Sequence, residues 1–317
     1  MFWTRPEIAE PTHISIERRG EIISEFAEMN PNGTVVICGG ESLMNPDRYY
    51  AISNQCRELG LKCFSVINGT KITNESEAEE MILHGATEVT VSINSHKKEV
   101  HDYTRGVDGS FEYAVNAIRL LLEARARLNG TNKIYAMAVI CEQNYRELDN
   151  FYDYVLNDLK ADKLKLNFLQ PTFGTLENMK EDDKFYRKNV ISDYDELTGI
   201  LHHCDEKYKL NFNQEWIDVV KLYHRSVKNN GDAALGWAGK GTEKSICNSC
   251  ERNIMINIHG VARLCFSTGF EGTQLSVYGD LKQFWYNNDE LRERMNICTQ
   301  YCGISHSVRR ISATNKF

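Results

Sequence analysis

The sequence predicts an α/β protein built on a parallel sheet, followed by a smaller cysteine-rich region. Two observations support this: short apolar runs alternate five times with helical patterns, and five of the ten cysteines fall in the last 71 residues. Strands that alternate with helices in this way are parallel and joined by right-handed crossovers. An αβ barrel or partial barrel fits the pattern, and an open doubly wound sheet is the alternative.

The first elements are a helix over residues 13–29 and a strand over 34–38. Isoleucines and Phe26 recur on one side of the helix between charged residues, and the turn at 30–33 ends it. The strand is a continuous run of β-branched residues, which predicts a strand buried on both faces. The chain begins with a helix, whereas the alternation predicts a strand before it.

The later elements follow in the same order. The expected strands are 63–67, 89–93, 133–140 and 163–169, and the helices between them are 47–59, 75–84, 110–129 and 145–156. Each strand is rich in β-branched or other apolar residues. Gly60 and Gly85 end the first two of these helices, and Asn144 is expected to cap the last one at its start.

Three regions follow from this order. Residues 1–172 form the α/β core, and residues 246–317 form the cysteine-rich region. Between them, residues 173–245 are rich in Asp, Lys, Asn and aromatic residues. We expect a connecting region there, with helices near 193–208 and 214–228.

Composition excludes several classes of protein. The net charge of −7 argues against a general nucleic-acid binder, which would carry a basic surface. The sequence contains no apolar run of the length that spans a membrane, and the first residues do not resemble a signal peptide. We therefore expect a cytoplasmic protein that binds neither nucleic acid nor membrane.

Polar residues stand where the predicted strands end. Glu41 follows two glycines after the first strand, Ser92 and Asn94 end the third strand, and Arg105 follows after a short loop. In such folds ligands bind at the carboxyl ends of the strands. A carboxylate for an ammonium group, with a hydroxyl and a guanidinium for a carboxylate, would suit an amino-acid-bearing nucleoside. Taken singly, Gly39-Gly40-Glu41 fits a binding turn and an ordinary turn equally well, whereas Ser92 fits an ordinary strand residue better and Arg105 a surface charge better. Their combination favours a site.

The cysteines divide into two groups. The scattered group is Cys38, Cys56, Cys63, Cys141 and Cys204, and we expect buried structural thiols there. The clustered group is Cys247, Cys250, Cys265, Cys298 and Cys302. Residues 254–265 are expected to form a hairpin that turns at His259-Gly260 and ends in a cysteine. In a reducing compartment this spacing favours an iron–sulfur cluster, with structural zinc as the alternative.

Together these motifs resemble the radical S-adenosylmethionine (radical SAM) superfamily. The resemblance implies a partial (β/α)6 barrel lacking its first strand. The core motifs are Gly39-Gly40-Glu41, Asn68-Gly69, Ser92-Ile-Asn94 and Arg105-Gly106, and the spacing Cys250-x9-Gly260-x4-Cys265 resembles the family's SPASM/Twitch extension. The resemblance implies that Gly39, Gly40 and Glu41 contact the amino end of S-adenosylmethionine. It further implies that Ser92 and Arg105 hold the carboxylate of this cofactor, that Asn94 lies at the same site, and that Leu169 flanks the adenine. Two departures are Ser42, where the family usually has proline, and Asn94, where many members have aspartate.

The same resemblance implies a 4Fe-4S auxiliary cluster on the clustered cysteines. It also implies hydrogen-atom abstraction from a peptide side chain or a small alcohol, with a reductant such as flavodoxin or ferredoxin. The catalytic CxxxCxxC motif of the family is absent from these 317 residues. The sequence therefore predicts either a truncated form of such an enzyme or a degenerate, non-catalytic relative that binds S-adenosylmethionine or a partner. A structural zinc protein is the third possibility.

Overall fold

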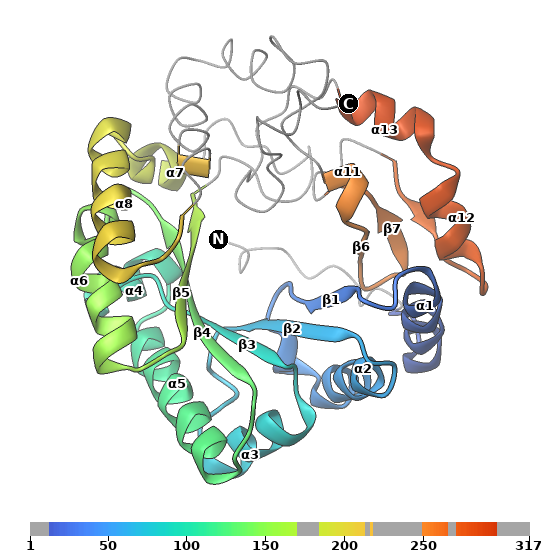
Figure 1. Ribbon diagram of the computed structural model, residues 1–317, viewed down its shortest axis with the longest axis horizontal. Coiled ribbons are helices and arrows are strands. Elements are labelled where there is room, and N and C mark those ends of the chain that lie inside the picture. Colours follow the sequence, from blue (N-terminus) through green and yellow to red (C-terminus); the bar gives the residue numbers. More distant parts are fainter. Residues whose placement is uncertain (1–12, 170–183, 213–215, 218–248, 266–270, 297–317) are drawn as a thin grey trace. The chain divides into compact units, whose positions relative to one another are not determined.

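A computed structural model describes residues 13–169, 184–212, 216–217, 249–265 and 271–296 of the chain (Figure 1). The chain divides into two compact units, each built from several stretches. The first comprises Met1–Ala138, Asn150–Leu166 and Val277–Lys282, and the second comprises Val139–Asp149, Asn167–Ser276 and Gln283–Phe317. The linear division at 172 and 245 remains a prediction.

A five-stranded sheet organises the fold. Its strands are β1 (Thr34–Ile37), β2 (Lys62–Ile67), β3 (Glu88–Ser92), β4 (Lys133–Ile140) and β5 (Lys163–Phe168). They lie in the order β1-β2-β3-β4-β5, and β1, β2, β3 and β4 pair in parallel. The predicted α/β class with a parallel sheet is confirmed. Each strand joins beside the one before it, as in a barrel, whereas a doubly wound sheet reverses its order.

The helices of the first unit follow the strands. They are α1 (Ile16–Met29), α2 (Pro46–Glu58), α3 (Glu75–His84), α4 (Lys98–Arg105) and α5 (Ser110–Arg127). Asn45 and Asn74 cap α2 and α3 with their side chains, and the Gly85 N–H bonds the last turn of α3. The predicted helices are confirmed within a few residues, but α4 was predicted as a loop. Its sequence has too few apolar residues to show a helical period.

The two faces of the sheet differ in burial. Cys63, Ile67, Val89 and Val91 are at most 2% exposed. On the other face, Ser92 and every second residue of β4 are half-buried or exposed, although Thr90 in the middle of β3 is only 2% exposed. Burial on both faces was predicted for β1, and this is wrong. β1 is an edge strand of this sheet, and Val36 is 53% exposed.

Three further predictions need correction. Cys38, predicted to be buried, is exposed at the end of β1, while the other four scattered cysteines are buried. The single helix predicted over 145–156 consists of a 3-10 turn (η3, Tyr145–Glu147), α6 (Leu148–Asp153) and a π-helical turn (η4, Tyr154–Asp158). Asn144 makes no side-chain cap, because its Oδ1 accepts from the Cys141 N–H at 2.8 Å and its amide donates to Val139.

The second unit contains helices and a small antiparallel sheet. The helices are α7 (Lys184–Asn189), α8 (Tyr194–Tyr208), α11 (Ser249–Arg252), α13 (Asp289–Asn296) and the end of α12 (Asp280–Tyr286). The sheet is formed by β6 (Met255–Ile256), β7 (Val261–Arg263) and β8 (Thr273–Gln274). The predicted hairpin is therefore confirmed, and Gly260 has the φ of +79° that its turn requires. The helix predicted near 214–228 lies largely outside the described residues.

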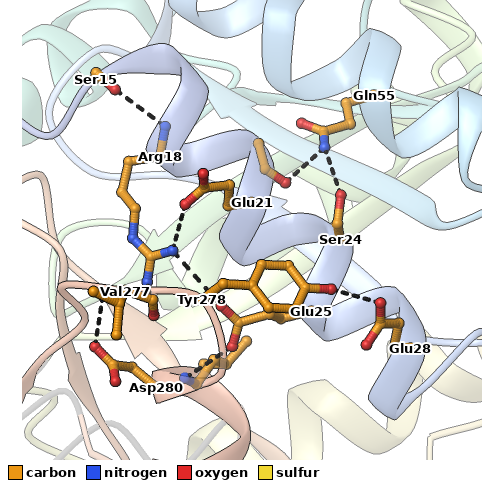
Figure 2. Close-up of polar contacts among 12 residues, drawn as sticks. Ser15, Arg18, Glu21, Ser24, Glu25, Glu28, Gln55, Val277, Tyr278 and Asp280 are labelled. Atoms are coloured by element: carbon orange, nitrogen blue, oxygen red, sulfur yellow. Dashed lines mark hydrogen bonds and ion pairs between the residues drawn. The ribbon is translucent and has the colours of Figure 1, made fainter.

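The segment Val277–Lys282 belongs to the first unit, where it lies on α1 (Figure 2). The Arg18 guanidinium donates to the Val277 carbonyl at 2.6 Å, and the Leu281 N–H donates to Glu25 Oε2 at 3.0 Å. The Tyr278 hydroxyl donates to Glu28 at 2.5 Å. α1 therefore uses one charged side to hold a segment that is distant in sequence.

No helix in the described part of the chain is both long and apolar enough to cross a membrane.

Candidate functional site

The backbone after β1 turns sharply at two glycines. Gly39 and Gly40 have φ angles of +100° and +58°, which residues with a Cβ rarely adopt. A Cβ added at either position would meet no atom within 4 Å. The turn therefore presents bare backbone next to open space, as the sequence predicted for a ligand that approaches closely.

Glu41 lies buried directly after this turn, with 9% of its surface exposed. Its Oε1 accepts from the Leu43 N–H at 3.2 Å, and its Oε2 accepts from the Asn68 N–H at 2.7 Å, so the carboxylate ties the ends of β1 and β2 together. Burial raises the pKa of Glu41, and the two hydrogen bonds and the charges of Arg105 and Lys71 oppose that rise. A cationic group of a ligand would stabilise the charged form further.

Arg105 lies in the last turn of α4 and is half-buried. Burial lowers the pKa of its guanidinium, and the Glu41 charge opposes this. In the described part of the chain, no hydrogen bond or ion pair reaches this guanidinium. A partly desolvated guanidinium with five donors is costly unless an anion pairs with it. The geometry therefore suits a ligand carboxylate.

Ser92 and Asn94 differ in their environment. Ser92 ends β3 on the half-exposed face, and its hydroxyl has no partner among the residues that the structure describes. Asn94 is 4% exposed, and its side-chain amide donates to Thr104 Oγ1 at 3.0 Å. Ser92 is therefore available to a ligand, whereas Asn94 ties the end of β3 to α4.

Sequence reasoning missed the pair that holds α4 in place. The Asn94 N–H donates to His101 Nδ1 at 3.0 Å, and the Asp102 carboxylate accepts from the Gly109 and Phe111 N–H groups, both at 2.8 Å. The signal was a His-Asp pair shortly before an arginine and a glycine. On a helix, His101 and Arg105 are one turn apart on the same face.

Leu169, the residue predicted to flank a ring, follows β5 directly and is half-buried. Its N–H donates to the Ile140 carbonyl at 2.9 Å. Both residues belong to the second compact unit. The structure thus brings Gly39, Gly40, Glu41, Ser92, Asn94 and Arg105 into one unit, and the placement of Leu169 beside them remains a prediction.

Two of the five clustered cysteines lie within the described residues. Cys250 is buried on α11, and Cys265 follows β7 and is half-buried. The Ser249 hydroxyl donates to the Leu264 carbonyl at 2.9 Å, so the residues just before the two cysteines are in contact. Arg292 of α13 donates to the Cys250 carbonyl at 3.2 Å. The short helix that carries Cys250 and the hairpin that carries Cys265 are thus joined beside the two cysteines, which makes these thiols candidates for a shared metal group.

Cys247, Cys298 and Cys302 lie outside the described residues. Within the described ranges, no three side chains of His, Cys, Asp and Glu are placed to hold a metal ion.

Comparison with known proteins identifies the relatives of this chain. The profile of the Radical SAM superfamily matches residues 1–155. The "AdoMet-dependent heme synthase" of Oleidesulfovibrio alaskensis is 32% identical over 114 residues, which are 36% of this chain and 29% of that protein. The "Antilisterial bacteriocin subtilosin biosynthesis protein AlbA" of Bacillus subtilis is 27% identical over 196 residues, 59% of this chain and 42% of that protein.

The chain spans less than half the length of these curated relatives. Among solved structures, "Native anSMEcpe with bound AdoMet" is similar with a TM-score of 0.59 and 14% identity, covering 90% of this chain and 78% of that one. At this identity the similarity shows the fold alone.

Proposed function

Because residues 1–155 belong to the radical SAM superfamily, we propose that this chain binds S-adenosylmethionine at the carboxyl ends of β1, β2 and β3. The observation that carries the proposal is the half-buried Arg105 guanidinium, which has no partner in the described residues and lies close enough to Glu41 for their charges to interact. Arg105 and Ser92 would bind the carboxylate of the amino-acid end. Glu41 would bind the ammonium group of the same end. Gly39 and Gly40, which have no side chains, would leave room for this group beside the backbone.

Calorimetry with S-adenosylmethionine tests this site. We expect Arg105→Ala to weaken binding by about tenfold or more, because a charge-assisted hydrogen bond of 1.5–3 kcal/mol is lost. Glu41→Gln keeps the length of the side chain and removes the charge, and it should also weaken binding. The matched control is Arg127→Ala, since Arg127 forms surface ion pairs with Glu75 and Glu79. Binding that neither site variant changes would overturn the proposal.

The clustered cysteines are proposed to hold an auxiliary 4Fe-4S cluster. The contact between Ser249 and Leu264 supports this, because it brings the backbones of Cys250 and Cys265 together. Of the two curated relatives described above, AlbA, the bacteriocin biosynthesis protein, matches the larger part of this chain. We infer a peptide side chain as the substrate by analogy with it, with a small alcohol as the alternative, and a flavodoxin- or ferredoxin-type reductant.

Iron, sulfide and zinc should be counted together after anaerobic reconstitution. We expect about four irons and four sulfides per chain and a loss of most of both in Cys265→Ser. Cys204→Ser is the control, because Cys204 is buried in α8. One zinc with neither iron nor sulfide would show that the zinc alternative is correct.

The 317 residues contain no CxxxCxxC motif, the segment on which the family's cluster for S-adenosylmethionine cleavage is held. We therefore expect this chain to bind S-adenosylmethionine without releasing 5′-deoxyadenosine under dithionite. Release of that product by this chain would contradict the expectation. Hydrogen-atom abstraction is proposed for the enzyme that contains both this chain's site and such a motif.

A further inference from the structure

Helix α4 carries Arg105 but has few stabilising features of its own. It has eight residues, and Lys97 at its start makes no side-chain cap. Helices of this length are marginal unless other parts of the protein support them. Its end is fixed by Gly106, whose φ is +70° and whose N–H donates to the Asp102 carbonyl at 2.8 Å. The direction of Arg105 therefore depends on what ties α4 to its neighbours.

His101 ties α4 to the end of β3. It is 1% exposed, and its Nδ1 accepts from the Asn94 N–H at 3.0 Å. Burial and, after it, the nearby Arg105 charge lower the pKa of His101 to about 4, so the ring is neutral at pH 7 and Nδ1 is available as an acceptor. The ring also packs edge-on against Phe111, with centroids 5.9 Å apart.

A second contact joins the end of β3 to α4, about one helical turn after His101. The Asn94 side chain donates to Thr104 Oγ1 at 3.0 Å, and this hydroxyl donates to the His101 carbonyl at 2.9 Å. His101 and Thr104 thus clamp Asn94 from both its backbone and its side chain. Ser92 is two residues before Asn94, and Arg105 is the residue after Thr104. The clamp therefore connects the two groups that face the proposed carboxylate.

We propose that His101 is a positioning residue for the amino-acid end of the ligand: it accepts the Asn94 N–H and so fixes Arg105 relative to Ser92. This rests on the proposed function of the site. Loss of the acceptor would leave the buried Asn94 N–H without a partner, and the strand end and α4 would separate to let water reach it. Arg105 would then no longer be held in position relative to Ser92, while the part of the site that receives the nucleoside would be unaffected.

Two ligands distinguish positioning from a general structural role. S-Adenosylhomocysteine and 5′-methylthioadenosine share the adenosine and a thioether, but only the first has the amino-acid end. His101→Phe removes the acceptor and keeps an aromatic ring against Phe111. His101→Asn restores an acceptor oxygen close to the position of Nδ1. Arg105→Ala is the reference for losing the carboxylate contact, and His84→Phe, at an exposed position, is the control.

We expect His101→Phe to weaken S-adenosylhomocysteine binding by about fivefold to tenfold, with less than a twofold change for 5′-methylthioadenosine. His101→Asn should recover most of the affinity. In the free protein, hydrogen exchange at the Asn94 amide should accelerate in His101→Phe and not in His84→Phe.

Equal loss for both ligands, or no loss for either, would overturn the role of His101. If Arg105→Ala is selective for the amino-acid ligand and His101→Phe is not, this inference alone fails. If Arg105→Ala shows no selectivity, the proposed function of the site fails. Unchanged exchange at Asn94 in His101→Phe would contradict the hydrogen bond itself, whatever the ligands do.

Discussion

One side chain of the first unit, His101, binds a proton less readily in the folded protein than in the unfolded chain. His101 is neutral in the folded protein, because burial keeps its pKa at about 4 against an ordinary value of 6.5. Arg105 also lowers this pKa, whereas Asp102, Glu112 and a backbone hydrogen bond with Ser110 raise it. The unfolded chain therefore binds a proton at this position between about pH 6.5 and 4, and the folded chain does not.

Stability should therefore fall as the pH is lowered through that window. We expect His101 to contribute up to about 3 kcal/mol to this loss, from a shift of roughly 2.5 pH units at 1.36 kcal/mol each. Urea unfolding at pH 7, 6 and 5 measures it, and His101→Asn should show a shallower dependence than the unaltered chain. His84→Asn should keep the full dependence. Parallel curves for the chain and for His101→Asn would show that His101 does not titrate as argued.

Among the elements, those that depend on local pattern were predictable and those that depend on the sheet were not. Gly85 ends α3 and Gly260 turns the β6–β7 hairpin as predicted, because both signals lie within a few residues. The exposure of β1 could not be read from its apolar run, since an edge position is set by strand order. Helix α4 was hidden for a related reason: its contacts with Asn94 and the start of α5 stabilise it, and those partners lie outside the helix.

In the candidate site, too, some features could be predicted from the sequence and others could not. Glu41, Ser92 and Arg105 could be proposed from the sequence because strand ends in an α/β fold converge. The use of the Glu41 carboxylate to bind the Leu43 and Asn68 N–H groups could not, since it depends on how two neighbouring loops meet.

A comparison of Gly60 with Gly69 distinguishes the cost of backbone strain from the cost of a steric clash with a neighbouring helix. Gly60 and Gly69 have φ angles of +70° and +89°, but an added Cβ meets nothing within 4 Å at Gly60. At Gly69 it would lie 2.9 Å from the Tyr113 carbonyl oxygen and 3.0 Å from Ala114 Cα on α5. We expect Gly60→Ala to cost about 1 kcal/mol of unfolding free energy and Gly69→Ala about 1–3 kcal/mol more. Equal losses in urea unfolding would mean that α5 moves freely away from the end of β2.

At the scale of the whole molecule, the first compact unit is assembled from three separate stretches of the chain. Its last stretch, Val277–Lys282, supplies hydrogen-bond partners to three side chains of α1. Glu25 is 2% exposed, and Arg18 lies 3.7 Å from its Oε1 while the Leu281 N–H occupies Oε2 (Figure 2). This buried carboxylate thus depends on a partner 256 residues away.

We expect Glu25→Ala to lower the free energy of unfolding by about 2 kcal/mol, because a charge-assisted bond is lost and the Leu281 N–H is left without its acceptor. Hydrogen exchange at 277–282 should accelerate in parallel. Glu28→Ala is the control: Glu28 is exposed and bonds the exposed Tyr278 hydroxyl, so its removal should cost no more than about 0.5 kcal/mol. Unchanged exchange at 277–282 in Glu25→Ala would show that this carboxylate does not hold the segment.

The same arrangement has a consequence for the order in which the protein is made. Translation proceeds at roughly 5–20 residues per second, so Leu281 leaves the ribosome about 13–50 seconds after Glu25. During that interval α1 has a carboxylate whose acceptor sites must stay hydrated, and the helix cannot be buried on that side. We therefore expect the charged side of α1 to remain open in the nascent first unit until Leu281 has left the ribosome.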